Sequence, residues 1–204
     1  TGSIRNLTIN NTQTYNLHAN LSLSGDLTIT SGTLTTVNSG GTNNTLTVTE
    51  ACDIGTAGNL NLNASTVSLG TINVANSAGA SMIFSSATTT ITLNPNSTHP
   101  TWGFSLSAAA TVNFNSGTIK FAKVDSGTRY MQMGGEGTHP LNNVIVDTNY
   151  DIPWAGFFEA ASLDLQDGNL NSYGGSTGIT ITGPLTVGNG SDVASLGYTA
   201  DSNG

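Results

Sequence analysis

The chain has 204 residues, a formal net charge of −8, and only 8% charged residues. Four basic residues are too few to form the positive face that phosphate neutralisation requires, which argues against nucleic-acid binding. No run of about 18 apolar residues is present to span a membrane. Apolar residues make up 36% of the chain and recur at alternating positions, so the composition predicts a folded all-β body rather than a disordered chain.

Strand patterns begin almost at once. Residues 4–37 alternate apolar and polar side chains nearly throughout, and 38–44 form a Gly-rich loop. The alternation resumes at 45–74 and returns at 82–84, 91–93 and 104–114. After residue 170 the sequence becomes rich in Gly and Ser, with further strand patterns at 179–181 and 185–187. No apolar period of 3.6 residues persists, so we expect no helix.

One unit recurs along the chain and is clearest at 110–122. Val112 and Phe114 point to one side, Asn115-Ser116-Gly117 turns the chain, and Ile119 restarts the alternation. The unit is therefore strand, tight corner, strand, with Asn113 and Lys120 facing solvent. In four copies, the first apolar residue of the second strand lies seven positions after that of the first: 27 to 34, 60 to 67, 112 to 119 and 163 to 170.

The strand starts are often 19 to 21 residues apart, as from 7 to 27 and from 27 to 46. An imperfect repeat of this length in an all-strand chain predicts a β-solenoid, in which each coil contacts only its neighbours. We expect one continuous solenoid over residues 1–182. Residues 183–204 would be a Gly/Ser-rich end, either a last coil or the start of further repeats. Both ends lie inside the repeat pattern, so the chain is expected to be an excerpt of a longer protein.

Three stretches rich in Gly and Pro are predicted to leave the coil as loops, at 95–103, 124–141 and 147–160. Large aromatic residues fall in or beside them. They could form a platform that stacks on sugar rings or on a protein partner, or they could cap the core where the coil is interrupted. The candidate ligand-contact residues are Trp102, Tyr130, Trp154, Phe157 and Phe158.

We expect no metal and no cofactor. The tripeptide Thr-His-Pro occurs at 98–100 and 138–140, but two histidines fall short of the three or four ligands that zinc requires, and a shared turn explains the match equally well. Residues 147–151 carry the alternating oxygen ligands of a calcium loop. However, Ile152 stands where that loop needs glycine and Phe158 where it needs glutamate. The lone Cys52 is expected to be buried filler.

Catalytic signals are weak, and we expect no enzyme activity. No serine-elbow, phosphate-loop or HExxH motif occurs. A glycosidase needs two carboxylates across a cleft, and Asp164 and Asp167 occupy a wet face and a corner, where ordinary turn chemistry explains them. The only grouping of acidic and basic residues is Lys120, Lys123, Asp125, Arg129 and Glu136.

Phrases such as Gly-Asp-Leu-Thr-Ile-Thr-Ser-Gly-Thr-Leu (25–34) and Thr-Gly-Pro-Leu-Thr-Val-Gly-Asn-Gly (182–190) carry a resemblance. They are similar to the repeats of bacterial surface adhesins of the filamentous-haemagglutinin and autotransporter kind, and equally to those of bacteriophage fibre proteins. The resemblance implies a right-handed parallel β-helix outside the cytoplasm, on a cell surface or a virion, that works as a spacer or attachment element. A plain stalk would not need the three predicted loops.

The leading hypothesis is a non-catalytic fibre or adhesin segment that contacts a cell-surface or polysaccharide ligand and associates with itself or continues into a longer fibre. The alternative is a polysaccharide-degrading β-helix enzyme or tailspike-like depolymerase, which would bring acidic residues from different coils together in a groove. Ice binding is a third idea. It needs a flat Thr face over consecutive coils, which Asn73, Asn113 and Asp164 are expected to interrupt.

Overall fold

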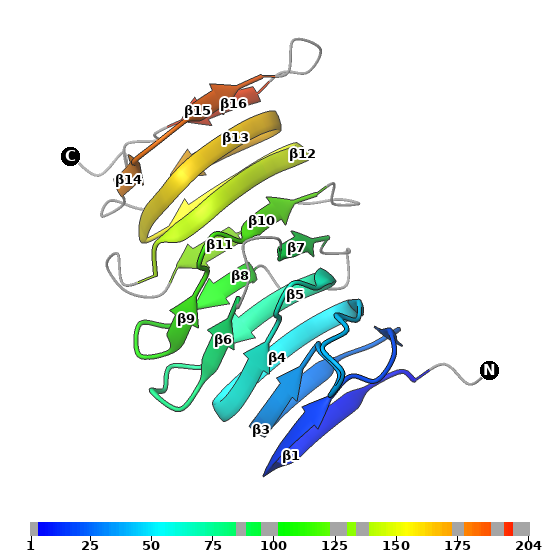
Figure 1. Cartoon of the computed structure of the whole chain (residues 1–204). Coiled ribbons are helices and arrows are strands. Elements are labelled where there is room, and N and C mark those ends of the chain that lie inside the picture. Colours follow the sequence, from blue (N-terminus) through cyan, green and yellow to red (C-terminus); the bar gives the residue numbers. More distant parts are fainter. Residues whose placement is uncertain are drawn as a thin grey trace.

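The computed structural model describes residues 4–84, 89–94, 102–122, 130–133, 139–172, 178–188 and 194–197. These residues form a stack of parallel strands (Figure 1). The strands are β1 (Leu7–Asn16), β2 (Leu21–Leu23), β3 (Leu27–Thr35), β4 (Leu46–Asn61), β5 (Thr66–Val74), β6 (Ser81–Ile83), β7 (Thr90–Leu93), β8 (Trp102–Leu106), β9 (Thr111–Asn113), β10 (Thr118–Phe121), β11 (Tyr130–Met133), β12 (Leu141–Ala155), β13 (Phe157–Ser172), β14 (Gly178–Ile181), β15 (Leu185–Val187) and β16 (Ala194–Gly197).

Three ladders of strands run along the stack, and each coil passes through them in turn. Ladder 1 contains the rungs at Leu7, Leu27, Cys52, Ile72, Phe104, Met131, Trp154 and Ser172. Ladder 2 contains those at Tyr15, Leu34, Leu60, Met82 and Val112. Ladder 3 contains those at Leu21, Leu46, Val67, Ile91, Ile119, Val144, Leu163 and Leu185. Every strand pair is parallel and successive coils lie roughly 22 residues apart, which confirms the predicted β-solenoid.

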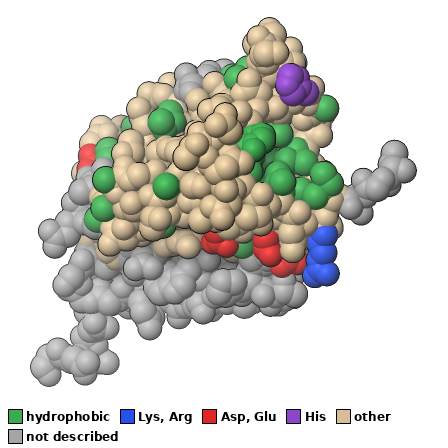
Figure 2. All heavy atoms as spheres, turned by 90° about the horizontal axis from the view of Figure 1, so that it is seen from below, with side chains coloured by type: hydrophobic (Ala, Val, Ile, Leu, Met, Phe, Trp, Pro, Cys, Tyr) green, Lys and Arg blue, Asp and Glu red, His purple; other side chains and the backbone are tan. Residues whose placement is uncertain are grey.

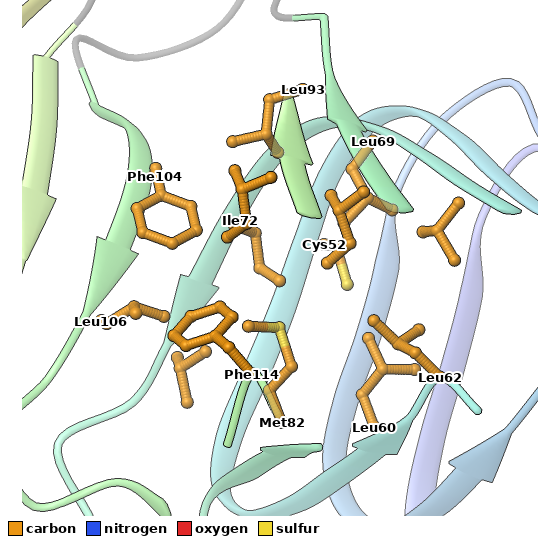
Figure 3. Packing of buried hydrophobic residues seen from close by; sticks show 14 of the residues in the cluster. Cys52, Leu60, Leu62, Leu69, Ile72, Met82, Leu93, Phe104, Leu106 and Phe114 are labelled. Atoms are coloured by element: carbon orange, nitrogen blue, oxygen red, sulfur yellow. The ribbon is translucent and has the colours of Figure 1, made fainter. Parts of the chain in front are cut away.

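The core is one continuous cluster along the axis of the stack. It consists of the alternate apolar residues of the three ladders, which Figure 3 shows packed between strands of neighbouring coils. Phe114 and Cys52 are buried, whereas Val112 is only partly buried. Each fully buried aliphatic or aromatic side chain stabilises the fold by about 1.5 to 3 kcal/mol, and the pairing of coils adds the backbone hydrogen bonds that a single coil could not form.

Each of the four repeated units turns at a residue with a left-handed backbone. The corner residue is Gly32 (φ 90°) or Gly168 (φ 82°) in two units and Asn63 (φ 44°) or Asn115 (φ 43°) in the others. Glycine and asparagine adopt this conformation at the least steric cost. The glycine follows the first apolar residue by five positions (27 to 32, 163 to 168), the asparagine by three (60 to 63, 112 to 115). The constant seven-residue offset therefore spans one corner. The four units are not equivalent, because one connects ladder 1 to ladder 2, two connect ladder 2 to ladder 3, and one connects ladder 3 to ladder 1.

The predicted loop at 147–160 is wrong. Residues 147–155 complete β12, and Asp147, Ile152 and Trp154 pair with Asp167, Leu170 and Ser172 of β13. Prolines and aromatics suggested a loop. However, Ile152 and Trp154 occupy alternate positions of a strand and are both buried.

The other two predicted loops are described only in part. Trp102 and Gly103 belong to β8, and Tyr130–Met133 forms β11, so parts of both stretches are strand. Residues 95–101, 123–129 and 134–138 lie outside the described residues. At the far end, β15 and β16 pair with β13, so stacked strands continue beyond residue 182.

Candidate ligand-contact surfaces

Trp154 does not contribute to an exposed aromatic platform. It lies in β12, pairs with Met131 and Ser172 of the adjacent strands, and has 3% of its surface exposed. Its ring belongs to the core, as the capping interpretation of the aromatic residues requires. The prediction that Trp154 contacts a ligand is therefore wrong.

The side chains of Trp102, Tyr130, Phe157 and Phe158 lie outside the part of the chain whose side chains are described, so their predicted contacts remain predictions. Their backbone positions are defined. Trp102 and Tyr130 are partners across β8 and β11 on ladder 1. Phe157 and Phe158 start β13 and pair with β14. In the chain they lie between the ladder 1 rung at Trp154 and the ladder 3 rung at Leu163, which places them on ladder 2. The fold brings Trp102, Tyr130 and Trp154 onto three consecutive strands of ladder 1 and places Phe157 and Phe158 on ladder 2.

Among the described residues, neither sequence signal for a metal gathers a set of ligands. The His139 imidazole is buried, with Nε2 3.0 Å from the carbonyl oxygen of Ser107, while His99 lies outside the described residues. Asp147 sits in a strand rather than in a calcium loop. Within the described ranges, no three His, Cys, Asp or Glu side chains are grouped to hold a metal ion. Burial, with a smaller contribution from Asp53, raises the pKa of the Cys52 thiol, so this thiol stays protonated and unreactive.

Acidic residues of adjacent coils lie at, and just before, the point where ladder 3 turns toward ladder 1. The Lys120 ammonium is 2.6 Å from the Asp147 carboxylate, and Asp147 is the backbone partner of Asp167 in the next coil. The Asp164 carboxylate accepts a hydrogen bond from Gln166 Nε2 at 2.6 Å, and Asp167 Oδ1 accepts one from the Gly168 amide at 2.7 Å. We call Lys120, Asp147, Asp164 and Asp167 the acidic corner.

Of the grouping expected from the sequence, the acidic corner contains Lys120. Lys123, Asp125, Arg129 and Glu136 lie outside the described residues, so their part of the expectation remains a prediction. Sequence reasoning missed Asp147 as the partner of Lys120 because it assigned Asp147 to the calcium-like motif. The register of ladder 3 would have identified this partner. Phe121 pairs with Val146, so Asp147 is the residue directly after that pair and lies near Lys120.

The outward face of ladder 3 carries two columns of hydroxyl groups. They are Thr45, Thr66, Thr90 and Thr118 in one column, and Ser22, Thr47, Ser68 and Thr92 in the other. In the described structure no hydrogen bond joins these hydroxyls to another residue. Elsewhere in the stack, outward side chains are linked across coils. Ser81 Oγ donates to Asn59, Ser31 Oγ to Asn10 at 3.2 Å and, further along ladder 3, Ser162 Oγ to Asn143 at 2.8 Å. Beside the columns lies a hollow of about 360 Å³ lined by Thr47, Thr49, Ser68, Gly70 and Asn94.

The three residues expected to interrupt a threonine face lie on three different ladders. Asn73 is in the ladder 1 column of Thr28, with Asp53 between them, so a threonine column is interrupted there. Asn113 lies on ladder 2, away from the hydroxyl columns. Asp164 does lie on ladder 3, beyond the hydroxyl columns. The columns therefore run through consecutive coils without an acidic residue.

The described residues contain no helix of the length and hydropathy needed to cross a membrane. Comparisons with protein-family models, curated proteins and solved structures each find no match to this chain.

Proposed function

We propose that the chain is a non-catalytic structural and adhesive segment of a fibre on a cell surface or virion. The observation that supports this role best is the continuous apolar core that runs along the stack from Ile9 to Leu170. A stack of parallel ladders with such a core is a stiff spacer, because each coil is held on both sides by backbone hydrogen bonds and buried side chains. The uncharged hydroxyl columns on its flank would let it work in water without attracting polyanions.

The adhesive part of the proposal rests on Trp102 and Tyr130. Their backbone partnership across β8 and β11 places two aromatic residues in adjacent coils, and aromatic rings are the side chains that stack on sugar rings. The ligand class is therefore a cell-surface or capsular polysaccharide.

A glycan array tests this contact by comparing the wild-type chain with a Trp102→Ala/Tyr130→Ala variant. The matched control is Tyr15→Ala, which removes an exposed aromatic ring at the far end of the stack. We expect binding to be lost in the double variant and retained in the control, with circular dichroism confirming that all three chains are folded. Unchanged binding by the folded double variant would remove the aromatic contact from the proposal.

The second candidate is a polysaccharide-degrading enzyme, and the acidic corner favours it. Asp147 and Asp167 are backbone partners in adjacent coils, and a glycosidase needs two carboxylates on one surface. Against it, Asp147 pairs with Lys120, and Asp164 and Asp167 accept local hydrogen bonds.

A reducing-end assay on neutral and acidic polysaccharides separates the two candidates. The non-catalytic role predicts no product from the wild-type chain. Product that disappears in Asp147→Asn and in Asp167→Asn would instead establish the enzyme.

A further inference from the structure

Ladder 3 stacks its strands in unbroken register from β2 to β10. Its rungs pair β2 with β4, β4 with β5, β5 with β7 and β7 with β10, and no bulge interrupts them. Parallel strands lie about 4.8 Å apart, and alternate residues of one strand lie about 6.6 Å apart. The outward side chains of this ladder therefore stand at the points of a regular two-dimensional grid.

Hydroxyl groups occupy this grid side by side in both columns. The pairs on successive coils are Thr45 and Thr47, Thr66 and Ser68, and Thr90 and Thr92. Ser22 extends one column and Thr118 the other. Threonine is branched at Cβ and has few χ1 rotamers, so most of these hydroxyls are held in a small set of positions.

The hydroxyls of the two columns are not used to hold the coils together. Among the described residues none of them is hydrogen-bonded to another residue, whereas the outward hydroxyls of Ser31, Ser81 and Ser162 each donate to an asparagine of the preceding coil. Each hydroxyl can donate one hydrogen bond and accept two. Neighbours about 4.8 Å apart are too distant to bond directly, so water or a ligand must satisfy these groups.

The grid carries no charge over these coils. The first ionisable side chain in either column is Lys120, which is the rung partner of Thr92 and forms an ion pair with Asp147. Figure 2 looks along the stack and shows few charged side chains, most of them gathered along one edge. A charged group keeps a strongly bound hydration shell of its own, and its absence leaves the water over the grid to be ordered by the hydroxyls.

We propose that the hydroxyl columns of ladder 3 bind the surface of ice. The oxygen atoms of hexagonal ice repeat at distances close to both spacings of the grid, so hydroxyls and the waters between them can take places in the lattice. A polysaccharide fits this face less well. Sugar sites are usually concave and use aromatic rings, whereas the columns contain only Thr and Ser on the face of a strand ladder. Ice binding is a further function that does not depend on the fibre role.

Incorporation into slowly growing ice tests the proposal in the full chain. Ice is grown from a protein solution and separated from the remaining liquid, and absorbance gives the protein concentration in each. The wild-type chain should be enriched in the ice. Thr45→Lys/Thr66→Lys and Thr47→Lys/Thr92→Lys each place ammonium groups in one column, and both variants should be rejected into the liquid, as an ordinary solute is.

The matched control is Thr8→Lys/Thr111→Lys. It makes the same substitutions and the same change in charge at exposed outward positions of ladders 1 and 2, and it should enter the ice as the wild type does. Circular dichroism establishes that each variant is folded. A gap between the melting and freezing temperatures, measured on single ice crystals, gives a second readout that should be lost in the same two column variants.

A wild-type chain that stays in the liquid, or folded column variants that enter the ice as well as the wild type does, would overturn the proposal. Column variants that lose glycan binding but still enter the ice would assign the face to a polysaccharide instead. The fibre role is tested separately by the Trp102→Ala/Tyr130→Ala variant, so the two failures are distinguishable.

Discussion

Phe114, which follows β9, should contribute more to stability than its outward neighbour Asn113. Its ring centroid lies 5.1 Å from that of Phe84, and 3% of its surface is exposed. Phe114→Ala should lower the free energy of unfolding by about 3 to 5 kcal/mol through lost burial and a residual cavity. Asn113→Ala removes only an exposed side chain that accepts one hydrogen bond, from the Asn115 amide at 2.8 Å, and should cost about 1 kcal/mol. Urea unfolding measures both, and equal losses would contradict the assignment of faces.

Cys52 should make the fold sensitive to alkaline pH. Burial raises the pKa of its thiol in the folded state, with Asp53 adding to the shift. Below the ordinary thiol pKa of about 8.5 both states hold the proton. Above it the unfolded chain loses the proton while the folded chain keeps it, so stability falls as pH rises. A Cys52→Ala variant should show a flatter decline between about pH 8 and pH 10 in the same urea titrations. Parallel curves for the two chains would show that the thiol is not responsible.

Two glycines, one at a corner of the strand–corner–strand unit and one in a loop, separate the cost of backbone strain from the cost of a clash between coils. Gly32 (φ 90°) and Gly41 (φ 83°) both have left-handed backbones. A Cβ at Gly32 would lie 2.2 Å from the carbonyl oxygen of Asn11 in the neighbouring coil, whereas one at Gly41 would meet nothing within 4 Å. Gly41→Ala should therefore cost about 1 to 2 kcal/mol of backbone strain alone. Gly32→Ala should cost clearly more because two coils must separate. Thermal melts of the pair test this, and similar losses would show that packing of the coils at this corner is loose.

The sequence predicted the unit but not its place in the coil. Alternation identified the inward residues of both strands around Asn115, because burial of alternate side chains is a local property. The same unit turns from ladder 1 to ladder 2 at Gly32 and from ladder 3 to ladder 1 at Gly168. Because the residues at these corners are similar, the sequence of a corner does not show which ladders its two strands join. Only the pairing of each strand with the neighbouring coils shows it. Pro153 shows that a local signal can also mislead. Proline is typical of loops, but this one lies inside β12 between two buried neighbours, Ile152 and Trp154.

Contacts between coils were hardest to predict because the coils of the whole molecule differ in length. Leu21 stacks on Leu46, 25 residues on, and Leu46 on Val67, only 21 residues on. A single insertion shifts every later pairing, so the partnership of Lys120 with Asp147 could not be read from spacing. The partnership of Trp102 with Tyr130 has the same origin. The candidate site is thus a product of register, whereas its residue types were visible in the sequence.

Because each coil contacts only its neighbours, the position of a defect should decide how far its effect spreads. Thr92 lies in β7, between β5 and β10, while Thr186 lies in β15, which pairs with β13 alone among the described strands. Both side chains face outward, so substitution by proline perturbs the backbone and spares the core. Proline removes an amide donor and restricts φ, and within a central strand both neighbours lose support.

Hydrogen exchange measured by mass spectrometry should distinguish the two variants. Thr92→Pro should abolish protection in Val67–Leu69 and Ile119–Phe121 and split the cooperative unfolding of the stack, because the apolar core passes through that coil. Thr186→Pro should reduce protection only in β15 and the adjoining part of β13. Protection lost throughout the chain in Thr186→Pro would mean that the solenoid unfolds as one unit, and that stability is not the sum of contacts between neighbouring coils.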